Sequence, residues 1–156
     1  MNTVTVIGIG NRDRGDDAAG PAVIDALAAA PPPGARLLTA PGDMLALLDL
    51  WGDAGHVILV DAMAAQAAPG RVLRLDAGDA ALTTALGNFA SSHAFDLAEA
   101  IELGRALGRL PSRLVIYGIE GEHFDHGQPP GAAVQAAVAE VGQRIRAEVG
   151  TCTKHP

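Results

Sequence analysis

Three polar residues spread along the chain are of types that can bind a divalent metal together: Asp17, Asp61 and His93. Carboxylate oxygen and imidazole nitrogen suit first-row ions such as nickel, zinc or iron. The single cysteine, Cys152, cannot form an internal disulfide, and no cysteine pair is present for a thiolate zinc site. These residue types therefore predict a metal site with oxygen and nitrogen ligands.

Each of these residues also has a simpler structural role open to it. Asp17 could cap the helix that follows it. Asp61 could accept backbone N–H groups in the turn after a strand, and His93, just after Ser92, could be an ordinary residue of a first helical turn. Residue type and spacing alone leave both readings open.

The elements that must position these residues follow from the hydrophobic pattern. Short apolar runs predict strands at 4–9, 56–62 and 113–119, residues 35–40 are a further strand candidate, and an alternating pattern predicts an edge strand at 71–75. Helical spacing predicts helices at 21–30, 43–51, 93–107 and 132–149. This alternation predicts an α/β fold, in which residues 1–150 form one three-layer αβα domain with a mainly parallel twisted sheet, followed by a tail at 151–156.

A parallel sheet brings distant residues to one edge, because ligands bind beyond the carboxyl ends of its strands. Asp17, Asp61 and the acidic segment that starts at Glu120 each follow the end of a predicted strand. His93 begins a predicted helix, and helices in this architecture start at the same edge. We therefore expect all four to lie along one rim of the sheet.

Four motifs, in order, carry a family resemblance. Residues 7–21 contain a strand, Gly-Ile-Gly-Asn, a short loop and an acidic pair. Asp61 closes a buried strand, Ser91-Ser92-His93 opens a helix, and residues 117–121 form a strand that ends in Gly-Ile-Glu. These motifs resemble those of the hydrogenase maturation proteases, and the resemblance in their order and spacing covers about residues 4–149.

This resemblance implies an αβα fold and an endopeptidase that removes the C-terminal extension of a [NiFe] hydrogenase large-subunit precursor after nickel insertion. By position, Asp17, Asp61 and His93 match the residues with which the family engages nickel, which the precursor itself supplies. Metal-assisted hydrolysis is the expected chemistry, and the implied enzyme is an aspartic-type, metal-dependent peptidase. Asp16 is a candidate general base, or else a solvated loop carboxylate.

Two departures from the family pattern bear on activity. Ala18 stands where a glycine usually follows the acidic pair, so a turn with positive φ is in question there. Residues 128–131, Gln-Pro-Pro-Gly, replace the Leu-Ser pair that usually opens the last helix. These departures motivate an alternative, a non-proteolytic chaperone that binds nickel or the precursor.

Composition and charge argue against other classes. A net charge of -7 and 3% aromatic residues disfavour nucleic acid as a partner, including the substrate of peptidyl-tRNA hydrolases, which share Gly-x-Gly-Asn. Dinucleotide binding is disfavoured because Asp13 replaces the third glycine of Gly-x-Gly-x-x-Gly. No signal peptide and no uncharged run of about 18 residues is present, so we expect a cytoplasmic protein that does not bind membranes. We also expect a monomer, and we expect His123 and His126 to be solvated loop residues.

Overall fold

The computed structural model describes residues 3–41, 46–64, 67–76 and 92–154. The strands of this part are β1 (Val4–Ile9), β2 (Ala35–Ala40), β3 (His56–Ala64), β4 (Val72–Asp76) and β5 (Arg113–Gly121). Its helices are the 3-10 helix η1 (Gly15–Ala18), α1 (Ala19–Ala28), α2 (Leu47–Trp51), α4 (Ser92–Ala106) and α5 (Ala132–Lys154). None of these helices has the length and apolar character needed to cross a membrane.

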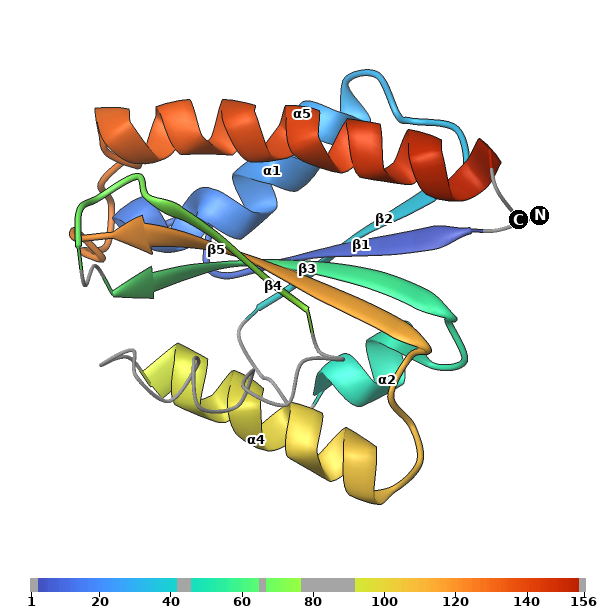
Figure 1. Cartoon of the computed structure of the whole chain (residues 1–156). Helices are drawn as coiled ribbons and strands as arrows, with labels where there is room; N and C mark the ends of the chain where they lie inside the picture. Colours follow the sequence, from blue (N-terminus) through green and yellow to red (C-terminus); the bar gives the residue numbers. More distant parts are fainter. Residues whose placement is uncertain (1–2, 42–45, 65–66, 77–91, 155–156) are drawn as a thin grey trace.

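The strands form one sheet in the order β2-β1-β3-β5-β4 (Figure 1). Every neighbouring pair is parallel except β4 and β5, which are antiparallel. The predictions of a mainly parallel sheet and of an edge strand near residues 71–75 are confirmed. The chain leaves β1 toward β2 on one side and later returns to β3 on the other side, so the sheet has a switch point between β1 and β3.

Helices cover both faces of the sheet, which confirms the predicted αβα architecture. Figure 1 shows α1 and α5 on one face and α2 and α4 on the other. Side chains of β3 alternate between these layers, as a strand requires. Ile58 and Val60 join the core under α1 and α5, whereas Leu59 and Met63 join the core under α2 and α4.

Several elements extend beyond their predicted ends. β3 continues to Ala64 and β5 to Gly121, because these two strands pair with each other through their polar positions. Helix α5 continues to Lys154, and Cys152 packs against the core below it. Part of the predicted helix at 43–51 falls on residues outside the described part of the chain, and α2 begins at Leu47.

Helix α1 packs unusually closely on β1, and two glycines allow this contact. A Cβ atom at Gly8 would lie 2.3 Å from the carbonyl oxygen of Gly20. A Cβ atom at Gly20 would lie 2.4 Å from the carbonyl oxygen of Ile9. Any side chain at either position would push the helix away, so these glycines place the start of α1, and the residues before it, against the switch point.

Candidate active site at the switch point

Asp17 lies in the turn between β1 and α1. Gly10, with φ of 141°, begins this turn in a conformation that favours glycine. The backbone N–H of Asn11 donates a hydrogen bond of 3.0 Å to Oδ2 of Asp17, and the Asp17 residue is only 4% exposed. Ala18, and not Asp17, occupies the N-cap position of α1. The carboxylate of Asp17 thus contacts its own loop beside the end of β1.

Asp61 lies on β3, directly beyond the point where β1 stops pairing with that strand. The last β1–β3 pair is Gly8 with Val60. Asp61 is therefore the first residue of β3 beyond its pairing with β1. β3 itself continues to Ala64, so the prediction that Asp61 ends its strand is wrong. It is fully buried and shares its face with Leu59 and Met63, the face that α4 covers.

His93 lies in the first turn of α4. The C-terminal end of α4 connects directly to Arg113, where β5 begins. The N-terminal end of α4, which holds His93, therefore lies toward the carboxyl edge of the sheet. Figure 1 shows the start of α4 on the side of the β3 and β5 arrowheads. The backbone of His93 is thus placed toward the expected rim, while its side chain lies outside the described part of the molecule.

Within the described side chains, which exclude that of His93, no three histidine, cysteine or acidic groups are arranged to hold one metal ion. Two of the three predicted ligands lie near the switch point: Asp17 in η1, after β1, and Asp61 within β3. The complete set of three stays a prediction.

Asp16 is only 1% exposed. The prediction that it could be a solvated loop carboxylate is therefore wrong. Its Oδ2 accepts the backbone N–H of Glu122 at 2.8 Å and that of His123 at 3.0 Å, and its Oδ1 accepts the backbone N–H of Gly131 at 2.8 Å. Burial alone would raise the pKa of Asp16, but these backbone hydrogen bonds outweigh burial and lower the pKa below its usual value.

Glu120 also proves to be a buried structural carboxylate. It lies within β5 and is 0% exposed, so the prediction that it begins a loop is wrong. Its Oε2 accepts the backbone N–H of Ala68 at 3.2 Å, and its Oε1 is 3.8 Å from Nη1 of Arg71. Glu120 therefore holds the connection that leads from β3 into β4.

The histidines of the following loop are confirmed as solvated residues. His123 and His126 are both exposed, and Nε2 of His123 is 2.8 Å from a carboxylate oxygen of its neighbour Glu122. Two small cavities of about 350 Å³ open on the carboxyl side of the sheet. One is lined by His123, Asp125, Gln128, Pro129 and Gly131, and the other by residues 10–13, Pro21 and residues 39–41.

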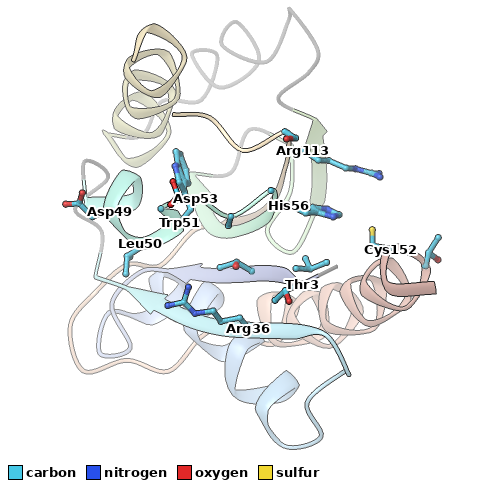
Figure 2. Close-up of a pocket in the computed structure, with 16 residues that line it drawn as sticks. Thr3, Arg36, Asp49, Leu50, Trp51, Asp53, His56, Arg113 and Cys152 are labelled. Atoms are coloured by element: carbon cyan, nitrogen blue, oxygen red, sulfur yellow. The ribbon is translucent and has the colours of Figure 1, made fainter. Parts of the chain in front are cut away.

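A larger cavity of about 930 Å³ lies at the opposite edge, where the strands begin (Figure 2). Its lining includes Arg36, His56, Arg113 and Cys152. Figure 2 shows Arg36 and Arg113 pointing away from each other, so they do not converge on one ligand. Because Cys152 belongs to this edge, the single thiol of the chain is remote from Asp17 and Asp61 and does not serve them as a nucleophile.

A comparison with known protein families assigns the family of this chain. A sequence model described as hydrogenase maturation protease matches residues 22–148. This chain belongs to the hydrogenase maturation protease family. The matched residues include Asp61 and His93, whereas Asp16 and Asp17 precede them. No curated protein sequence matches the chain.

Solved structures share the fold of this family member over nearly its whole length. The hydrogenase maturating endopeptidase HybD from E. coli is 24% identical, with a TM-score of 0.81 over 96% of this chain and 93% of that one. The [NiFe] hydrogenase maturation protease HybD from Thermococcus kodakarensis is 21% identical, with a TM-score of 0.77 over 94% of this chain and 99% of that one. At such identities these likenesses establish the αβα fold.

Both departures from the family pattern have a structural description. Ala18 has φ of -78° and ψ of -1°, an ordinary right-handed conformation, so this family member needs no glycine there. Residues 128–131 lead into α5, and the last of them, Gly131, donates its N–H to Asp16. The sequence does not reveal the hydrogen bond between Asp16 and this segment, because the donors are backbone N–H groups, which any residue type can supply.

Proposed function

We propose that this hydrogenase maturation protease is an endopeptidase that removes the C-terminal extension of a [NiFe] hydrogenase large-subunit precursor after nickel insertion. Membership of the family supports the peptidase activity. The observation that carries the proposal further is the placement of two buried carboxylates at the switch point of the sheet: Asp17 in η1, after β1, and Asp61 on the neighbouring strand β3.

Asp17 and Asp61, joined by His93, would engage the nickel ion that the precursor brings. Two carboxylates and an imidazole fit a divalent first-row metal. A buried carboxylate is also most stable beside a positive charge, because burial disfavours its ionised form. Bound nickel would supply Lewis-acid activation of a carbonyl or a water molecule. In this proposal the three side chains recognise a finished nickel centre and orient the adjoining peptide for hydrolysis.

The nickel requirement gives the enzyme a way to distinguish a completed precursor from an incomplete one. Without nickel, the precursor would bring no cation to Asp17 and Asp61 and would lose that electrostatic contact with the enzyme. We therefore propose that nickel acts as a recognition element that arrives and leaves with the precursor, and that the enzyme itself works as a cytoplasmic monomer.

The test is a cleavage assay with a nickel-loaded large-subunit precursor and the same precursor without nickel, followed by intact mass. The proposal predicts loss of a C-terminal peptide in the nickel-loaded sample alone. Cleavage of both samples would contradict the role of nickel. Binding of the precursor without any cleavage would contradict the peptidase and favour the chaperone, the alternative that the sequence of residues 128–131 motivates.

A further inference from the structure

Asp16 is adjacent to a proposed metal-engaging residue, yet its own carboxylate points into the protein and contacts a distant part of the chain. Its three hydrogen-bond donors are the N–H groups of Glu122 and His123, just after β5, and of Gly131, just before α5. These donors are 106, 107 and 115 residues away in sequence. One side chain therefore holds both ends of the loop that joins β5 to α5.

Further hydrogen bonds, in which the backbone of residues 15 and 16 is the donor and the loop is the acceptor, reinforce this attachment. The N–H of Asp16 donates to the carbonyl oxygen of His123 at 2.7 Å, and the N–H of Gly15 donates to that of Gln128 at 2.9 Å. Gly15 has φ of 55°, and a Cβ atom there would lie 2.3 Å from the same carbonyl oxygen of His123. The two segments therefore fit together only with glycine at position 15.

This geometry is unsuited to proton transfer. Both oxygens of Asp16 already accept backbone N–H groups, and the side chain is almost completely buried, so neither oxygen is presented to a water molecule or a substrate. A general base must instead come within hydrogen-bond reach of the proton that it removes. The carboxylate of Asp17, by contrast, accepts the backbone N–H of Asn11 in the loop after β1.

We infer that Asp16 is a positioning residue that fixes residues 121–131 against η1 and so builds one wall of the groove that receives the precursor. The wall includes the small cavity lined by His123, Asp125 and Gln128. Because Asp16 and Asp17 are neighbours in η1, the same contact sets the distance between this wall and the proposed metal-engaging carboxylate. The role in precursor binding rests on the proposed function, whereas the attachment itself does not.

The test compares the chain with Asp16→Asn, which keeps the size of the side chain but turns an N–H donor toward backbone N–H groups. We expect amide hydrogen exchange at Glu122, His123 and Gly131 to accelerate by about tenfold or more, the size expected when a buried hydrogen bond is lost. We also expect a higher KM and weaker binding of the nickel-loaded precursor, with the shape of the pH–rate profile unchanged.

Glu148→Gln serves as the matched control, because it removes a carboxylate that accepts hydrogen bonds from Arg74 and Tyr117, away from this loop. It should alter overall stability without changing the KM. Unchanged exchange in Asp16→Asn, or faster exchange with wild-type KM and precursor affinity, would overturn the inference. Loss of one limb of the pH–rate profile at constant KM would overturn it in favour of a base. Absence of cleavage by the unsubstituted chain would count against the proposed function alone, since exchange and precursor affinity still decide the role of Asp16.

Discussion

The backbone of Gly121 packs directly on the side chain of Asp16. A Cβ atom at position 121 would lie 2.6 Å from Cβ of Asp16 and 3.2 Å from its carboxyl carbon. The glycine that ends β5 and the acidic pair that follows β1 therefore belong to one contact. This contact joins two motifs of this sequence, the strand that ends in Gly-Ile-Glu-Gly and the acidic pair more than 100 residues earlier.

Gly121→Ala tests this contact. The added methyl group would displace Asp16 from its three backbone donors, so we expect a loss of about 1–3 kcal/mol in the free energy of unfolding, as overpacked sites show, together with slower precursor cleavage. Urea denaturation gives the first quantity. Gly142→Ala is the matched control, because a Cβ atom there meets nothing within 4 Å and should be neutral or stabilise α5 by about 1 kcal/mol. Equal effects of both substitutions would contradict the contact.

The fold could be predicted from the sequence because its signals are local. The predicted bounds of β1, a run rich in β-branched residues, and of β2 agree with the structure, and the alternation at 71–75 predicts the edge strand β4. The ends of β3 and β5 were missed. Asp61 and Glu120 read as strand ends because they are charged, but β3 and β5 pair with each other through these positions, and that pairing is not local.

The site was predictable only in part, for the same reason. Asp17 and Asp61 could be assigned to one edge because each lies near the end of a strand in a parallel sheet. The burial of Asp16 could not be predicted, because its hydrogen-bond partners are three backbone N–H groups more than 100 residues away in the sequence. A carboxylate that binds backbone groups has no partner residue type for a sequence pattern to reveal.

Ala18→Gly tests whether the family's usual glycine is needed after the acidic pair. Alanine already adopts a right-handed conformation there, so glycine would only add freedom to the unfolded chain. We expect the free energy of unfolding to fall by about 0.5–1 kcal/mol and the cleavage rate to stay unchanged. Thermal or urea denaturation, with a cleavage assay, measures both. A marked gain in cleavage would show that Ala18 impairs the turn.

The hydrogen bonds to Glu148 predict that the protein loses stability in acid. Burial would raise its pKa, but hydrogen bonds from Arg74 and Tyr117 outweigh burial and lower the pKa below its usual value. The ionised form is thus favoured in the folded protein, and this stabilisation is lost as the pH falls through the lowered pKa. Unfolding measured between about pH 5 and 3 should show a smaller loss of stability for Glu148→Gln than for the unsubstituted chain. Parallel curves would contradict this.

His56 predicts a second pH effect, at higher pH. Burial, followed by the nearby charge of Arg113, lowers the pKa of this imidazole from its ordinary value of 6.5. As the pH falls, His56 therefore takes up its proton in the unfolded chain before it does so in the folded protein. Its effect on the free energy of unfolding is absent above pH 6.5, and the folded protein becomes less stable as the pH drops from 6.5 toward the lowered pKa. In urea denaturation, His56→Gln should reduce the dependence of the free energy of unfolding on pH below pH 6.5. A slope unchanged in His56→Gln would contradict the assignment.

The most direct test of the central claim is the rate at which Asp17→Asn, Asp61→Asn and His93→Ala remove the C-terminal extension from a nickel-loaded precursor, measured by intact mass beside Glu148→Gln. Each of the three substitutions should slow cleavage by roughly a hundredfold or more, a loss typical of removing a catalytic group, while Glu148→Gln cleaves at the rate of the unsubstituted chain. Cleavage at the unsubstituted rate by all three variants would contradict the claim that Asp17, Asp61 and His93 form the active site.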